Sequence, residues 1–168
     1  MKRIAKTVVL GLFFSVTFLF IAASDGFSEE YESLIGLQSV KAVFDVRKGD
    51  LKSVASMFNL IHDTYRDKSI RAVSKKPEFA IVLSGPAVSF VSKNWKGFEL
   101  KEQKDLDRIA VKIAAMSKDG IKIEICSLAA KVFNVEASSI LPGIKHVHNG
   151  WISLIGYQSN GYSLIPVY

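Results

Sequence analysis

Short apolar runs alternate with segments of helical spacing along most of the chain. The runs are mainly continuous and rich in β-branched residues, which is typical of strands that are buried on both faces of a sheet. The third run, IKIEI, instead alternates apolar and polar positions. The pattern predicts strands at 40–46, 79–83, 121–125, 144–147 and 162–167.

Between these runs, apolar residues recur every three or four positions, as they do on one face of a helix. Asp50 and Asp105 each precede such a segment and are predicted to cap it. Residues 93–104 are polar apart from Trp95 and Phe98, and they are predicted to form a surface loop. Three roles are open for the two aromatic side chains: they cover a pocket, contact a neighbouring subunit or anchor the loop. Helices are predicted at 51–65, 88–91, 106–118, 126–133 and 150–158.

The alternation of strands and helices predicts the fold class. A chain that repeats strand and helix builds a mostly parallel sheet with helices on both faces. We therefore expect an α/β fold with a single doubly wound, mostly parallel five-stranded sheet, in the flavodoxin-like or Rossmann-like layer architecture. The domain is expected over residues 40–168, after a polar lead-in at 25–39 that includes a short helix near 29–37.

The first 24 residues have the pattern of an export signal. Lys2, Arg3 and Lys6 form a basic start, residues 7–21 carry no charge, and the small residues Ala22-Ala23-Ser24 follow. This pattern predicts a signal peptide at 1–24 and a periplasmic or secreted protein. The apolar run is shorter than the ~20 residues of a membrane span, although an uncleaved anchor remains an alternative. We expect no stable membrane insertion after cleavage.

The charge balance changes once this segment is set aside. The whole chain has 22 basic and 16 acidic residues, a formal net charge of +6, but without Lys2, Arg3 and Lys6 the basic count falls to 19 and the net charge to +3. A nucleic-acid site needs a concentrated basic face, so no nucleic-acid partner is expected. The chain also lacks the glycine-rich nucleotide motifs and the zinc-hydrolase and serine-hydrolase motifs, and no cofactor is predicted.

The candidate chemistry lies at the carboxyl ends of the predicted strands. Ligands of open α/β sheets bind at this edge. Cys126 is the only cysteine of the chain, so it has no internal disulfide partner. We take it as the candidate catalytic residue. The candidate binding residues are those that follow the strands: Arg47, Lys48, Ser84, Gly85, Ser127, His148 and Asn149.

The position of Cys126 allows more than one interpretation. A thiolate at a helix N-terminus is stabilised by the unpaired N–H groups and the partial positive charge there, and a thiolate is the nucleophilic form of cysteine. Alternatively, Cys126 is a small buried hydrophobe. A third hypothesis is a copper or zinc site of Cys126, His146 and His148, although the favoured site contains no metal. His62, within the first helix, is expected at the surface or half-buried.

The sequence also resembles the DsrE/DsrF-like family of sulfur-relay proteins, in its exported branch. Four segments carry the resemblance, and the strand–cysteine–helix pattern IEICSLAAK is the most specific part of it. Together they span nearly the whole predicted domain. The segments are VKAVFDVRKGD (40–50), FAIVLSGPAV (79–88), MSKDGIKIEICSLAAKVFNV (116–135) and ILPGIKHVHNGWISLIGYQSNGYSLIPVY (140–168).

The resemblance implies a small doubly wound α/β domain that assembles into homo-oligomers. It also implies that the cysteine at the position of Cys126 carries a persulfide, received from or passed to a donor or acceptor protein or a small sulfur species. The first hypothesis is therefore a periplasmic thiol protein that carries sulfane sulfur. The alternatives are a non-enzymatic assembly module, in which Trp95, Phe98 and Trp151 make subunit contacts, and a metal-binding periplasmic protein.

Overall fold

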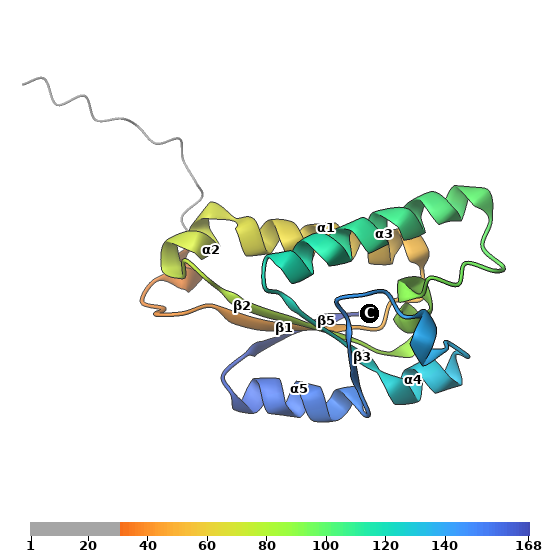
Figure 1. The fold of residues 1–168 in the computed structure, drawn as a ribbon. Coiled ribbons are helices and arrows are strands. Elements are labelled where there is room, and N and C mark those ends of the chain that lie inside the picture. The colour runs from red at the N-terminus through yellow and green to blue at the C-terminus, as the bar shows by residue number, and fades with distance from the viewer. Residues whose placement is uncertain (1–30) are drawn as a thin grey trace, which may run out of the picture.

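The computed structural model describes residues 31–168, so the predicted signal peptide lies outside the described residues. The described chain forms one five-stranded sheet in the order β4-β3-β2-β1-β5, and every neighbouring pair is parallel (Figure 1). This confirms the predicted α/β fold class. The strands are β1 (Lys41–Val46), β2 (Glu78–Leu83), β3 (Lys122–Cys126), β4 (Lys145–Val147) and β5 (Ser163–Val167).

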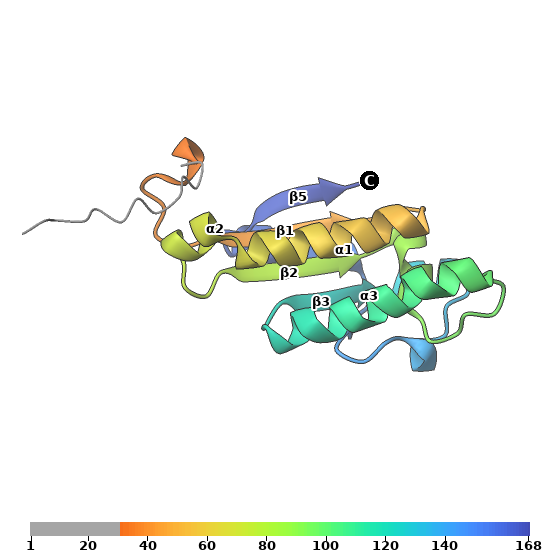
Figure 2. The same cartoon turned by 90° about the horizontal axis from the view of Figure 1, so that it is seen from above.

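Helices cover both faces of the sheet. Figures 1 and 2 show α1 and α3 side by side across one face, and Figure 1 shows α5 against the other. The helix α5 carries the chain from β4, at one edge, to β5 at the opposite edge. The helices are α1 (Leu51–Arg66), α2 (Lys68–Val73), α3 (Leu100–Lys118), α4 (Ser127–Val132) and α5 (Gly150–Ser159), with 3-10 turns η1 (Glu32–Leu34), η2 (Gly85–Val91) and η3 (Ala137–Ser139).

Helix capping confirms one prediction and corrects another. Asp50 caps α1 as expected, because its side chain accepts a hydrogen bond from the Ser53 N–H at 2.7 Å. The helix α3 begins at Leu100 rather than after Asp105, so the predicted loop is shorter than expected. Glu99 and Glu102 form a capping box that satisfies the first N–H groups of α3.

The two layers of the core follow the alternation of side chains along the strands. Phe44 and Ile81 point toward α1 and α3, whereas Val43 and Val82 point toward α5, where Leu154 covers them. Because β2 is buried on both faces, residues 79–83 are continuously apolar. No helix within residues 31–168 combines the length and the apolarity that a membrane crossing requires.

The aromatic residues of the connection before α3 anchor it to the core. The Trp95 indole N–H donates to the Ser92 carbonyl at 2.9 Å, and the rings of Phe98 and Phe90 lie 6.2 Å apart. Both residues are partly buried against the larger core. Of the three roles considered for these side chains, the structure therefore supports anchoring of the loop. Both side chains are half-buried, so the expectation that they are exposed is wrong, and their role in subunit contacts stays a prediction.

Candidate functional site

The candidate residues share one face of the sheet because they occupy alternate strand positions. Asp45 and Cys126 point toward α5, since their neighbours Val46 and Ile125 pack into the core on the α1 side. Asp45 lies in β1, and Cys126 is the last residue of β3, so β2 separates them. The carboxyl ends of three parallel strands thus bring their polar groups together.

A cavity of about 280 Å³ lies at this edge. Five of the eight predicted site residues line it, and three residues that sequence reasoning missed complete its walls. The hydrophobic side chains of Leu128 and Trp151 are exposed at its rim. The lining residues are Arg47, Ser84, Gly85, Cys126, Leu128, Ala129, Asn149 and Trp151.

The Cys126 thiol is buried where two helices begin. Cys126 is the N-cap residue of α4 and is only 6% exposed, and its Sγ lies 3.9 Å from the His148 carbonyl oxygen. A β-carbon built on Gly150, the first residue of α5, would lie 3.7 Å from Sγ and 3.2 Å from the Cys126 Cβ. The thiol therefore lies beside the first residues of α4 and α5, with its Sγ–H as the donor toward the His148 carbonyl.

Arg47 is held by a buried carboxylate. Asp45 is 1% exposed, and it accepts hydrogen bonds from Arg47 Nε at 3.0 Å and from Arg47 Nη2 at 2.7 Å. This two-point contact fixes the guanidinium in one orientation and raises the pKa of Arg47 above its ordinary value. Asp45 also accepts longer hydrogen bonds from Ser84 Oγ at 3.5 Å and Tyr168 Oη at 3.4 Å.

The remaining predicted residues lie beside the cavity rather than in its walls. The Lys48 ammonium donates to the backbone carbonyl of Tyr168. Ser127 is half-buried in the first turn of α4. His148 contributes its backbone carbonyl, which accepts from the Leu128 N–H at 3.2 Å, while its side chain is exposed.

The geometry gives the metal hypothesis no support. Among the described residues, no three His, Cys, Asp or Glu side chains are grouped so that they could hold a metal ion. The side chains of His146 and His148 are exposed, whereas Cys126 is buried. A copper or zinc site of this composition needs all three side chains within ~2–2.3 Å of one point.

The arrangement is suited to nucleophilic chemistry on a small substrate. The cavity provides one thiol, a positioned guanidinium and the polar side chains of Ser84 and Asn149, and Leu128, Ala129 and Trp151 form its apolar walls. In its thiolate form a cysteine can attack an electrophilic sulfur. The volume of the cavity limits that substrate to a small molecule or to a chain end.

Comparisons with known proteins agree with this architecture. A sequence model of the DsrE/DsrF-like family matches residues 41–167. An uncharacterized protein of Aquifex aeolicus (strain VF5) is 24% identical over 128 residues, which are 76% of this chain. The match spans 56% of that relative, so this chain covers little more than half of its length.

Two solved structures have the same fold. A protein of unknown function, MTH1491 from Methanobacterium thermoautotrophicum, matches with a TM-score of 0.58 and 13% identity over 76% of this chain and 99% of its own. The ychN protein from E. coli matches with a TM-score of 0.50 and 13% identity over 77% of this chain and 99% of its own. At this identity the likeness concerns the fold alone.

Proposed function

We propose, on the premise that this chain belongs to the DsrE/DsrF-like family, that it carries sulfane sulfur as a persulfide on Cys126. The observation that carries the proposal is the position of the single thiol in a cavity where α4 and α5 both begin. Helix N-termini stabilise a thiolate, and they stabilise a persulfide anion in the same way.

The proposed loading step is a transfer between sulfur atoms. The Cys126 thiolate attacks the outer sulfur of a donor R–S–SH, a new S–S bond forms to Sγ, and the bond between the two donor sulfurs breaks. The donor leaves as the thiolate RS⁻ and the proton remains on the transferred sulfur, so the charge is unchanged. Arg47 and Asn149 line the cavity and are assigned to orient the donor.

The proposed location is the periplasm or another exported compartment. It is supported by the basic, apolar and small-residue pattern of residues 1–24. An exported carrier with one cysteine has no internal disulfide partner, so the thiol remains available to an external sulfur donor or acceptor.

Intact-mass spectrometry of polysulfide-treated protein tests the loading step. The wild-type chain has one thiol, so we expect adducts of about 32 Da per sulfur atom that disappear on treatment with dithiothreitol. Cys126→Ser is expected to give none, and Ser127→Ala, the matched control at the next position, is expected to load like wild type. No adduct on wild type, or an equal adduct on Cys126→Ser, would overturn the proposal.

A second candidate function, an assembly module, is favoured by the outer face of α5. Trp151, Ile152 and Ile155 are each more than 60% exposed, although the inner face of the helix already contacts the sheet through Leu154. A helix that is apolar on both faces is typical of one buried on both. We propose a second copy of this chain as the occupant, in line with the expected homo-oligomer.

Sedimentation equilibrium of purified protein decides whether this face associates. Ile155→Ser is expected to shift an oligomer toward monomer. The matched control is Val111→Ser, which replaces a residue of α3 that is 71% exposed. A monomeric wild type, or equal dissociation by both variants, would refute the assembly proposal, and neither result bears on persulfide loading.

A further inference from the structure

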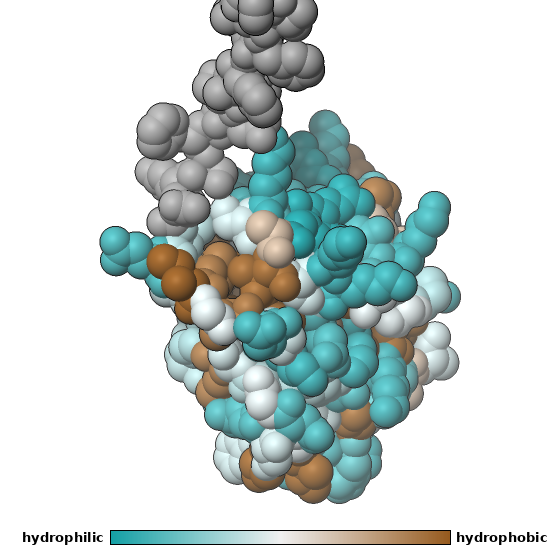
Figure 3. Space-filling model, turned by 90° about the vertical axis from the view of Figure 1, so that its left-hand side faces the viewer, coloured by the Kyte–Doolittle hydropathy of each residue, from teal (hydrophilic) through white to brown (hydrophobic). Residues whose placement is uncertain are grey.

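A second polar cavity lies at the opposite end of the sheet from Cys126. This open cavity of about 450 Å³ lies beside the first residues of β2 and β3, and its lining includes the buried rings of Tyr65 and Phe79. Figure 3 views the molecule from this end, where hydrophilic side chains gather across the middle of the face. The charged residues that line the cavity are Arg71, Lys75, Lys76, Lys122, Glu78 and Asp119.

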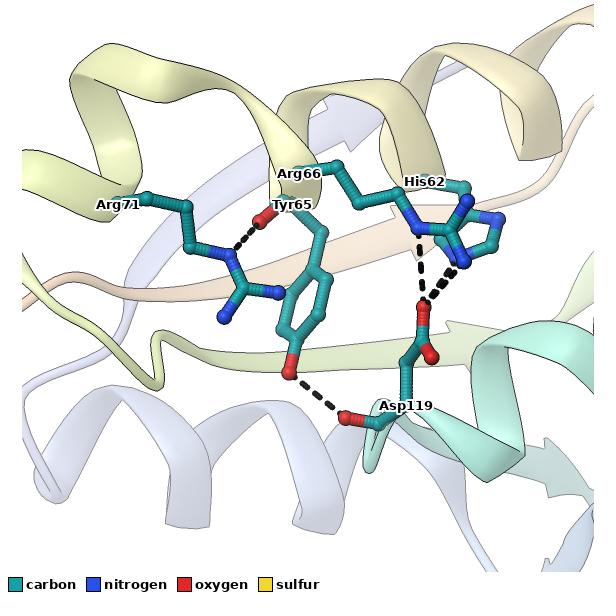
Figure 4. Close-up of polar contacts among 5 residues, drawn as sticks. All are labelled: His62, Tyr65, Arg66, Arg71 and Asp119. Carbon is teal, nitrogen blue, oxygen red and sulfur yellow. Dashed lines mark hydrogen bonds and ion pairs between the residues drawn. The ribbon is translucent and has the colours of Figure 1, made fainter.

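Both carboxylates of the cavity are bound to groups other than its cations. Glu78 pairs with Lys41 at 2.9 Å and accepts the Tyr162 hydroxyl at 2.8 Å. The Asp119 carboxylate is likewise bound by groups that do not line the cavity. Figure 4 shows two side chains of α1, His62 and Arg66, directed at it. These carboxylates are therefore already neutralised by other partners.

The partners of Asp119 come from α1. His62 Nε2 lies 2.8 Å from Asp119 Oδ2, and Arg66 donates to the same oxygen through Nε at 3.0 Å and Nη2 at 2.9 Å. His62 is 2% exposed, so the expectation that it lies at the surface or half-buried is wrong. Two side chains on one carboxylate oxygen leave Asp119 little capacity to neutralise the cations of the cavity.

Arg71 is positioned without any carboxylate. Its Nε donates to the Tyr65 carbonyl at 3.0 Å, its Nη1 donates to the Lys75 carbonyl at 2.5 Å, and its guanidinium lies 4.5 Å from the centre of the Tyr65 ring (Figure 4). Carbonyl oxygens and an aromatic face hold a guanidinium in place but leave its positive charge uncompensated. Arg71 is thus a fixed cation in the cavity wall.

The three lysines add mobile charge around this fixed cation. Lys75 and Lys76 lie in the connection from α2 to β2, and both are exposed. Lys122 donates to the Tyr162 hydroxyl at 3.3 Å and lies 5.8 Å from the centres of the Tyr157 and Tyr162 rings. Within residues 31–168, no ion pair involves these lysines or Arg71. Lys122 lies close enough to Glu78 to help lower the pKa of that carboxyl, so the cations of the cavity without a nearby counter-charge are Arg71, Lys75 and Lys76.

We propose that this cavity binds a small phosphate-bearing anion, with Arg71 as the positioned donor and Lys75, Lys76 and Lys122 as neutralising charges. Guanidinium groups donate to phosphate oxygens from a fixed fork, and lysine ammonium groups bind phosphate as point charges. The volume of the cavity, about 450 Å³, is in the range of small-molecule sites. This site is separate from the thiol cavity and does not depend on sulfur chemistry.

Isothermal titration of the full chain with sodium pyrophosphate tests the proposal. Saturable binding is expected, weakened by added sodium chloride because salt screens exposed charges. The double variant Lys75→Gln/Lys76→Gln is expected to weaken binding about tenfold. The control double variant Lys52→Gln/Lys104→Gln removes the same amount of charge, but from α1 and α3. It is expected to change the affinity for pyrophosphate by less than about twofold.

The outcomes separate a built site from general charge attraction. Wild-type affinity in Cys126→Ser, combined with the difference between the two lysine double variants, supports the proposal. No saturable binding by wild type would overturn it, and so would an equal loss of affinity in the two double variants. Both variants alter lysines outside the core, and a circular dichroism melt confirms that each one folds.

Discussion

Gly150 lies where α5 meets the sheet, and we expect Gly150→Ala to disturb both stability and the thiol. A β-carbon at this position would lie 3.1 Å from the Val82 Cγ1 and 3.2 Å from the Cys126 Cβ. Val82 is fully buried in the sheet and has no room to move away, whereas the Cys126 side chain borders the cavity. The added methyl group must displace α5 or the cysteine side chain.

The magnitude follows from two opposing effects. Overpacking of a filled core costs about 1–3 kcal/mol, whereas replacement of glycine by alanine in a helix gains at most about 1 kcal/mol. Gly150→Ala is therefore expected to lower the free energy of unfolding by about 1 kcal/mol. A β-carbon on Gly156 of the same helix would meet no atom within 4 Å, so Gly156→Ala is expected to raise the free energy of unfolding by about 0.5–1 kcal/mol.

Urea unfolding of the two variants measures this difference, and iodoacetamide alkylation reports on the thiol. We expect slower alkylation of Cys126 in Gly150→Ala and an unchanged rate in Gly156→Ala. If both variants gain stability and alkylate at the wild-type rate, the close contact between α5 and Cys126 does not exist in solution. The assignment of the α5 N-terminus to the thiol site would then be refuted.

Two further predictions concern the dependence of stability on pH. Hydrogen bonds from His62, then from Arg66, lower the pKa of Asp119 below 3.8. Its stabilisation is therefore present above that value and is lost as the pH falls through the folded-state pKa. Asp119→Asn should lower the urea midpoint at neutral pH, and the difference from wild type should shrink as the pH falls below 3.8; a difference that does not change with pH would contradict this. Burial, then the hydrogen bond to Glu78, raises the pKa of Tyr162 from 10.0 to about 12. The free energy of unfolding should therefore fall as the pH rises from 10 toward 12. Tyr162→Phe should reduce this slope, and an unchanged slope would count against the assigned hydrogen bond.

The central strand β2 was predictable from the sequence because it is buried on both faces, which requires a continuous apolar run. The helix α2 was missed because it is short and has no buried residue. Its start depends on Asp67, whose side chain accepts from the Ser69 N–H at 2.8 Å. The early start of α3 was missed because glutamate is an uncommon N-cap residue.

The sequence could predict only part of the site, through the rule that ligands of an open α/β sheet bind at the carboxyl ends of its strands. That rule identifies residues after strands, and it found Arg47, Ser84 and Cys126. It did not pair Asp45 with Arg47, although residues two apart on a strand share a face and could have indicated the contact. The approach of Gly150 to Cys126 depends on how α5 crosses beneath the sheet, which no local pattern encodes.

The central claim is that Cys126 holds transferable sulfane sulfur. Cyanide removes such sulfur as thiocyanate and leaves the thiol behind, so cyanolysis of protein that has been loaded with polysulfide and desalted counts it directly. We predict about one thiocyanate per wild-type chain and none above background from Cys126→Ser. A wild-type yield equal to that of Cys126→Ser would contradict the assignment of this protein as a persulfide carrier.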